Sequence, residues 1–383
     1  MREWDSVSEF TDQLFAHLRR AEQRRWAHAY VRGLLSTPGK KSIRRLAALA
    51  SDSPTAPQAL HQFINESPWE WDPVCDQLRQ WAADRVRPRA WTVAPVVLPK
   101  RGDKSCGVHR RFIPHTGRTV NCQLGIAVFM STDAGEFPVG WRLFVPEQWT
   151  RGPLREQARI PQARVHSTEL EILHLIDSMV RNSPHLSVPV VADLDGYMDS
   201  RRLIDGLAGQ GRDFLVAIPD GFPLAPLNFR AGIPRTPVAA VTLLPDEHAP
   251  EARPAPRRPG ASPRPGRPAA QDRLVQLPGA APGDQRPRPL RLFARTESPT
   301  GGPGRLWLTN LVDRPADELV AYTERHPTTG ETVDLLQRGF GLRDFEGRSF
   351  PGWHHHMTLV SAAFAFSRLA DAAGAAGAQP ASA

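Results

Sequence analysis

The stretch WTVAPVVLPKRGDKSCGVHRR, residues 91–111, marks the point at which the chain changes from helical to strand periodicity. Its first half is apolar and rich in β-branched residues, which predicts a buried strand. Its second half is basic and contains glycine, which predicts an exposed loop. Loops that follow strands often carry catalytic side chains. The tip of this strand instead carries Ala94 and Pro95, two residues without acid–base chemistry.

The composition indicates a folded protein with a polyanionic partner. The chain has 383 residues, enough for two or three domains, and 40% of them are hydrophobic. Its formal net charge is +8, which favours nucleic acid as the partner. An alternative is that the Arg-, Ala- and Pro-rich composition reflects a GC-rich genome.

Cysteine usage and hydropathy indicate the compartment. Cys75, Cys106 and Cys122 are far apart and form no CxxC pair, which argues for a reducing cytoplasm and against disulfides or structural zinc. The opening residues, MREWDSVSEF, are polar and acidic, unlike a signal peptide. No apolar run approaches the roughly 20 residues of a membrane-spanning helix. We therefore expect a cytoplasmic protein without a membrane partner.

Residues 1–88 are predicted to form a helical N-terminal region that binds DNA. Two short helices are expected at 42–50 and 57–64, separated by a break rich in serine and proline. Such a helix–turn–helix with a basic entrance suits DNA docking, although a helical hairpin with a solvated basic face is an equally good interpretation. The basic residues at this entrance are Lys40, Lys41, Arg44 and Arg45.

From residue 91 onward, strand and helix patterns alternate. Strands are expected at 91–98, 120–128 and 141–145, followed by a helix at 167–180, a strand at 188–192, a helix at 201–209 and a strand at 213–218. Three strands followed by helix, strand, helix and strand is the order of a ribonuclease-H-like core. The predicted fold class is therefore α/β, with an all-helical N-terminal region.

An insert interrupts this core. Between Glu251 and Leu290 there are ten prolines, eight arginines and three acids, a composition that cannot bury enough apolar surface to fold. We interpret it as a disordered linker, or alternatively as a basic arm along a phosphate backbone. The predicted boundaries are 1–88 for the helical region, 89–228 for the first part of the core, 229–300 for the insert, 301–370 for the last strand and C-terminal helices, and 371–383 for a disordered tail.

Four separated blocks resemble a known family. VNCQLGIAVF, GWRLFVPEQW, VVADLDGYMD and GLRDFEGRSFPGWHHHMTL are similar to blocks of IS701-type transposases, which belong to the IS4-like group of DDE enzymes. The resemblance runs in one order from about Phe10 to Phe366, interrupted only by the insert. It implies DNA binding, strand cleavage and transfer during transposition, and three carboxylates around two Mg²⁺ or Mn²⁺ ions.

The resemblance places the first two acid positions. The family's first acid lies in a stretch similar to W-V-V-D-D-T-G-F-P-K-K-G, which matches residues 91–102 without a gap, so Ala94 and Pro95 occupy its two acidic positions. Asp193 matches the second acid and is the retained catalytic and metal-binding position. Asp195 adds a carboxylate on the same side if the strand continues. A lone aspartate is expected to hold a metal only weakly.

The family's third acid lies on a helix similar to R-W-x-I-E-x-x-Y-x-E-L-K. Here the Arg position is His326, the Glu position is Gly330 and the Lys position is Gln337. Glu331 is adjacent to the vacated position, but one residue of helix rotates a side chain by roughly 100°. Residues 327–330 are poor helix formers, so the first turn of this helix is not expected to be regular.

A basic loop surrounds the tip of the strand at 91–98. In an active relative such a loop faces substrate phosphates, and it can keep DNA contacts without catalysis, whereas a solvated loop is the alternative. The three histidines at 354–356 point in different directions on a helix, so we expect no zinc site there. The candidate DNA contacts in the loop are Lys100, Arg101, Lys104, Arg110 and Arg111.

Three hypotheses for function follow. The first is a transposase by descent that has become a pseudoenzyme and binds double-stranded DNA, as a fossil or a domesticated regulator. The second is a metal-dependent nuclease rewired around Asp193, Asp195 and Glu331, with Asp199 as a further candidate. The third is a repurposed core with unrelated chemistry or only a protein-interaction role. A homodimer, as in transposase assemblies, and association with the nucleoid are expected if the protein binds DNA.

Overall fold

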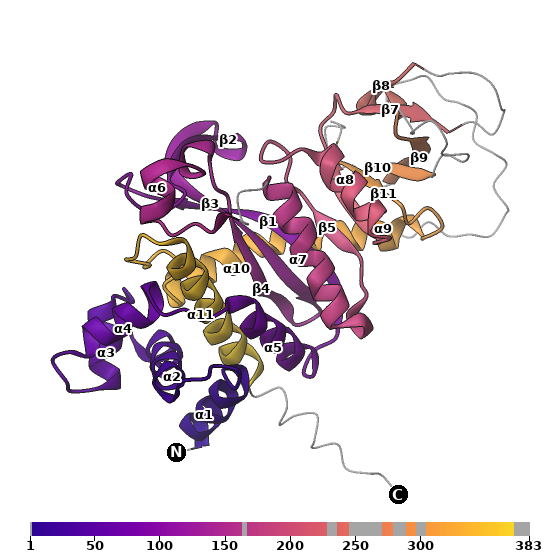
Figure 1. Ribbon diagram of the computed structural model, residues 1–383. Helices are drawn as coiled ribbons and strands as arrows, with labels where there is room; N and C mark the ends of the chain where they lie inside the picture. The colour runs from indigo at the N-terminus through magenta and orange to yellow at the C-terminus, as the bar shows by residue number, and fades with distance from the viewer. Residues whose placement is uncertain are drawn as a thin grey trace, which may run out of the picture. The chain divides into compact units, whose positions relative to one another are not determined.

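A computed structural model describes residues 2–162, 167–227, 236–244, 270–278, 289–295 and 304–370. Within these ranges the chain has a mixed α/β fold that divides into two compact units (Figure 1). Unit 1 comprises Met1–Val188, Gly196–Met198 and Arg325–Ala383, and unit 2 comprises Pro189–Asp195 and Asp199–Glu324. The predicted tail at 371–383 lies outside the described residues.

Unit 1 begins with five helices. They are α1 (Arg2–Leu14), α2 (Ala21–Ser36), α3 (Ile43–Ala50), α4 (Ala56–Asn65) and α5 (Trp71–Ala83). Helix α11 (Phe350–Leu369) contacts α2, α4 and α5 and is buried along most of its length (Figure 1). A helix that is apolar on all sides requires such an environment. In the described part of the chain, no helix has the length and apolar character needed to cross a membrane.

Unit 1 also contains an antiparallel sheet in which β3 pairs with three other strands. The strands are β1 (Pro88–Pro99), β2 (His109–Ile113), β3 (Arg118–Thr132) and β4 (Gly135–Leu143). The further helices of this unit are α6 (Gly152–Gln157), α7 (Thr168–Asn182) and α10 (Arg325–Gly339). The helices at 2–83 therefore belong to the same compact unit as these strands.

Helices α7 and α11 cover opposite faces of this sheet. A Cβ on Gly125 would lie 3.1 Å from Trp353 of α11, and a Cβ on Gly140 would lie 3.0 Å from Leu175 of α7. Gly140 pairs with Val128, and positions 125 and 128 of β3 point to opposite faces. The two glycines let both helices approach the strands closely.

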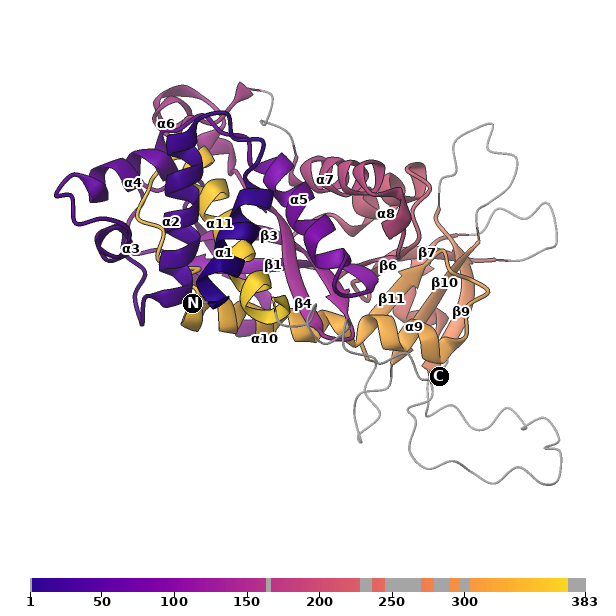
Figure 2. The same cartoon turned by 90° about the horizontal axis from the view of Figure 1, so that it is seen from below.

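In the described part of unit 2, seven strands lie in the order β5-β6-β11-β10-β9-β7-β8. They are β5 (Val190–Ala192), β6 (Phe214–Ile218), β7 (Pro223–Pro226), β8 (Val238–Ala239), β9 (Ala270–Gln276), β10 (Leu290–Arg295) and β11 (Leu306–Thr309). Strands β5 and β6 are parallel, and the other pairs are antiparallel. Helix α8 (Ser200–Gly209) packs on β6, and α9 (Ala316–Thr323) contacts β6 and β9 (Figure 2).

Along the chain, the elements β1, β3, β4, α7, β5, α8 and β6 follow the predicted order. The insert at 229–300 differs from the prediction, because β8, β9 and β10 lie within it. Leu290, Leu292 and Phe293 are buried and supply apolar surface that the surrounding Arg/Pro composition concealed. The prediction of a disordered linker at 251–290 is therefore wrong for β9, which lies inside that range, whereas β8 and all of β10 except Leu290 lie outside it. Much of the remaining insert lies outside the described residues.

Candidate functional site

The position matched to the first acid is part of the core of unit 1. Ala94 lies on β1 opposite Ala127 of β3, and 3% of it is exposed. Residues 125 and 127 share the face of β3 that α11 covers, so Ala94 points to that face as well. Pro95 is half-buried opposite Ile126. Neither side chain carries an atom that can bind a metal.

The position matched to the second acid carries an ion-pair cluster in unit 2. Asp193 directly follows β5, and the backbone N–H of Asp195 donates to Asp193 Oδ1 at 3.4 Å. Arg305, which directly precedes β11, donates from Nε to Asp193 Oδ2 at 3.0 Å and from Nη2 to Asp193 Oδ1. Its Nη1 donates to Asp195 Oδ2 at 2.9 Å. One guanidinium therefore binds both carboxylates.

The two carboxylates stabilise the positive charge of Arg305. Burial acts to lower the pKa of Arg305, but the hydrogen bonds and negative charges of Asp193 and Asp195 outweigh it and the pKa is raised. The side chains of Arg305 and Asp193 are 34% and 25% exposed. At this depth a forked, charge-assisted pair is stronger than a pair on the open surface.

These residues do not fit a two-metal site. Mg²⁺ and Mn²⁺ need oxygen ligands from several carboxylates when two ions clamp a phosphate. Across the described ranges, no three His, Cys, Asp or Glu side chains gather in a way that could hold a metal. Asp193 and Asp195 are both engaged by Arg305 instead.

Asp199, the further candidate for a rewired site, caps a helix. Its carboxylate accepts hydrogen bonds from the backbone N–H groups of Arg201 at 2.9 Å and Arg202 at 3.3 Å, at the start of α8. This is the ordinary contact of an N-cap aspartate.

The helix matched to the third acid is α10, and it begins at Arg325. It includes residues 327–330, so the prediction of an irregular first turn is wrong. Proline is tolerated in the first turn of a helix because its missing N–H would have no partner there. Gly330 and Glu331 are exposed, and Gln337 is half-buried. Glu331 belongs to unit 1, whereas Asp193 belongs to unit 2.

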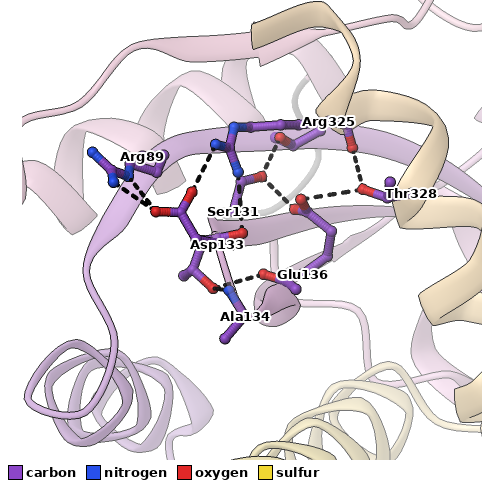
Figure 3. Close-up of polar contacts among 10 residues, drawn as sticks. Arg89, Ser131, Asp133, Ala134, Glu136, Arg325 and Thr328 are labelled. Carbon is purple, nitrogen blue, oxygen red and sulfur yellow. Dashed lines mark hydrogen bonds and ion pairs between the residues drawn. The ribbon is translucent and has the colours of Figure 1, made fainter. Parts of the chain in front are cut away.

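The start of α10 is anchored to the turn between β3 and β4 (Figure 3). Arg325 donates to the Thr132 carbonyl at 3.0 Å and to Asp133 Oδ1 at 3.1 Å. Thr328 Oγ1 donates to Glu136 Oε1 at 3.2 Å. Burial raises the pKa of the Glu136 carboxyl, against hydrogen bonds that act to lower it. These contacts stabilise a helical turn that local propensity disfavours.

Two of the predicted DNA-contacting residues, Lys41 and Arg111, make hydrogen bonds within unit 1. Lys41 is 4% exposed, its ammonium donates to the Thr37 carbonyl, and its backbone N–H donates to Asp344 Oδ2 at 2.7 Å. Arg111 donates to the carbonyl of Tyr197 at 2.8 Å. Both side chains donate to backbone carbonyls of unit 1, Lys41 from a buried position and Arg111 from a half-buried one.

The other predicted contacts are more accessible. Lys100 is half-buried, and its pKa is lowered by burial although the charge of Asp344 acts to raise it. Lys40 lies 3.5 Å from Glu346, and 65% of its side chain is exposed. The exposed members of the predicted set are Lys40, Arg44, Arg45, Arg101, Lys104 and Arg110.

The turn at 341–348 joins the two basic segments, which are far apart in sequence. Asp344 accepts from the backbone N–H of Lys41, two residues before α3, and the Arg348 carbonyl accepts from the Cys106 N–H at 3.1 Å. Gly341 has a φ of +71°, and a Cβ there would overlap the side chain of Lys41. Arg343 is exposed on the same turn. We name the following exposed set the basic edge: Lys40, Arg44, Arg45, Arg101, Lys104, Arg343 and Arg348.

The three adjacent histidines at 354–356 are structural. His355 stacks on Trp69 with ring centroids 3.8 Å apart, and its two nitrogens lie 2.8 Å from the carbonyls of Ile64 and Trp69. His356 contacts the Tyr30 hydroxyl at 2.8 Å. Burial lowers the pKa of His355 and of His356 to about 4. The rings of His355 and His356 are buried and contact groups of the core of unit 1.

Sequence reasoning missed Arg305 and Arg343, whereas Arg348 was expected to fix the turn or to contact DNA. Arg305 is the first residue of a predicted strand, a weak signal because its partners are about a hundred residues earlier in the chain. Arg343 lies in the GLRDFEGRS block, which was matched to the family as a whole and gave no separate signal for this arginine.

Comparisons with known proteins give the following matches. A family model described as DDE superfamily endonuclease matches residues 13–282, a range that includes Ala94 and Asp193 but not α10. A search of curated proteins finds no match. The cryo-EM structure of a piggyBac transposase synaptic complex with hairpin DNA is similar with a TM-score of 0.43 and 10% identity, over 100% of this chain and 75% of that chain. A likeness of that size carries no inference.

Proposed function

Because the chain belongs to the DDE superfamily endonucleases, we propose that it binds double-stranded DNA through the basic edge and does not cleave it by a two-metal mechanism. The protein is then a transposase by descent that retains the DNA contact of its ancestors. The blocks that resemble IS701-type transposases support this narrower ancestry, and the order of elements along the chain supports a ribonuclease-H-like core.

The basic edge is the observation that carries the binding half of the proposal. Its seven cations belong to a helix entrance, a loop and a turn that hydrogen bonds join within unit 1. The nearby acids are Asp103, Asp344 and Glu346, of which Asp344 binds a backbone N–H and Glu346 pairs with Lys40. An excess of exposed cationic side chains suits the phosphate backbone, which needs charge and position rather than sequence readout.

The residues at the matched acid positions support the second half of the proposal, that the protein does not cleave DNA by a two-metal mechanism. The family chemistry uses metal-bound carboxylates to activate water or a 3′-hydroxyl. Ala94 and Gly330 provide no ligand, and Asp193 is bonded to Arg305. The exposed cations can hold phosphates at the basic edge, whereas the residues that the structure describes offer no group of carboxylates for a metal clamp. Homodimerisation and association with the nucleoid extend the proposal and rest on family resemblance alone.

Two assays on the purified protein test the two halves separately. Fluorescence anisotropy with a labelled duplex is expected to show binding that weakens steeply as salt rises, because each phosphate contact releases counterions. Supercoiled plasmid with Mg²⁺ or Mn²⁺ is expected to stay intact. Salt-independent binding, or none, would refute the first half. Metal-dependent nicking that Asp193→Ala abolishes would refute the second half and favour a nuclease rewired around Asp193, Asp195 and Glu331.

A further inference from the structure

The strand order of unit 2 brings Arg305 to Asp193. Strands β5 and β6 run parallel, with Ala192 opposite Val216. Strand β11 runs antiparallel to β6, with Leu306 opposite Ile218, so it starts where β6 ends. The carboxyl ends of β5 and β6 and the beginning of β11 therefore meet at one edge of the sheet. A long side chain on the residue before β11 can reach across β6 to the residue after β5.

The guanidinium contacts are more than a single surface ion pair. Three of the four oxygens of Asp193 and Asp195 accept hydrogen bonds from Arg305. The bond from the Asp195 N–H to Asp193 Oδ1 holds the turn between the two acids. The planar fork of an arginine matches this arrangement, whereas a spherical ammonium cannot donate along three separate directions with the same geometry.

A divalent ion and the guanidinium would compete for the same oxygens. Mg²⁺ and Mn²⁺ bind proteins through one or two carboxylates, and Asp193 and Asp195 are such a pair once Arg305 is removed. While Arg305 remains, its positive charge repels a second cation at short distance. The cluster also retains more negative than positive charge, because two carboxylates face one guanidinium.

We propose that Arg305 is the resident cation of the Asp193–Asp195 pair and keeps divalent ions out of it, so that neutralising Arg305 creates a divalent-cation site. The inference deepens the proposed function, since it rests on that account of the second acid position. It concerns only unit 2 and does not require DNA binding by the basic edge.

Mn²⁺ titration of the full chain, followed by calorimetry and by the electron paramagnetic resonance signal of free Mn²⁺, tests the proposal. Arg305→Gln is expected to bind one Mn²⁺ at least about tenfold more tightly than the unsubstituted protein, because a competing charge has been removed. Arg305→Gln combined with Asp193→Asn is the matched control and is expected to lose that gain. If Arg305→Gln does not fold, Arg305→Lys, which keeps the charge but loses the fork, is expected to show a smaller gain that Asp193→Asn also abolishes.

Two results would overturn the inference. One is an unsubstituted protein that already binds Mn²⁺ as tightly as Arg305→Gln. The other is a folded Arg305→Gln with no gain over the unsubstituted protein. Duplex binding, measured on the same samples, separates this failure from that of the proposed function: the Arg305 variants are expected to bind DNA like the unsubstituted protein, and loss of DNA binding by every sample would refute the basic edge alone.

Discussion

The two units differ in how they accommodate the residues matched to the family's acid positions. In unit 1, the position matched to the first acid is Ala94, a small side chain in the packed core, and burial lowers the pKa of His355 and of His356 on α11. In unit 2, the second acid position keeps its charge at partial exposure, with an arginine as the counter-ion. The comparison teaches that the position matched to the first acid is ordinary core, whereas the carboxylates at the position matched to the second acid have an arginine of the protein as their counter-ion.

The largest expected effect concerns the first acid position. Ala94→Asp is expected to lower the free energy of unfolding by about 3 kcal/mol or more, because a carboxylate would be buried in the core of unit 1 without a partner. Urea unfolding measures the change, and Ala21→Asp at the exposed start of α2 is the matched control. A stable Ala94→Asp protein that nicks plasmid would show that this position is still an active-site position.

A second effect concerns the pH dependence of stability that the buried His355 of unit 1 produces. His355 has a pKa of about 4 in the folded chain against about 6.5 when unfolded, so the unfolded state binds more protons between these values. Stability is therefore complete above pH 6.5 and is lost as the pH falls toward 4, by about 3 kcal/mol for this residue.

Urea unfolding between pH 7 and pH 4.5 measures this slope. His355→Gln is expected to reduce the dependence of the unfolding free energy on pH. His61→Gln, at an exposed position, is expected to retain the dependence of the unsubstituted protein. Equal slopes for all three proteins would mean that the buried imidazole is protonated without cost.

A smaller effect is expected for the charged cluster of unit 2. A double-mutant cycle with Asp193→Asn and Arg305→Gln is expected to give a coupling of about 1 kcal/mol, a value already discounted for solvent screening because a third of the Arg305 side chain is exposed. Thermal or urea unfolding of the four proteins measures it. Zero coupling would mean that the paired charges of unit 2 contribute nothing to its stability.

The smallest effect in free energy is expected at the basic edge. The double variant with Arg44→Ala and Arg45→Ala is expected to bind duplex several-fold more weakly. The slope of the logarithm of the binding constant against the logarithm of the salt concentration is expected to fall in magnitude by about one for each arginine. Arg314→Ala is the matched control, because it removes an exposed cation from unit 2. An unchanged slope in the double variant, or an equal loss in the control, would place DNA contact elsewhere on the chain.

Local patterns predicted most elements because burial periodicity is encoded within a few residues. The strand expected at 120–128 lies within β3, and the helix expected at 167–180 coincides with most of α7. The start of α10 was missed because its helix depends on Arg325 and Thr328 binding the β3–β4 turn. Strands β9 and β10 were missed because the composition around them concealed short apolar runs.

The amino-acid sequence by itself determined the order of the elements, the basic character and the residues at the matched acid positions, since these are properties of single residues and short windows. Only the tertiary structure decided which charged side chains bind other groups of the protein. Lys41 and Arg111 complete backbone hydrogen bonds, whereas Arg305 meets Asp193 across 112 residues of chain. A charge on a long side chain has no local signature of its partner, because strand order and turn geometry choose that partner when the chain folds.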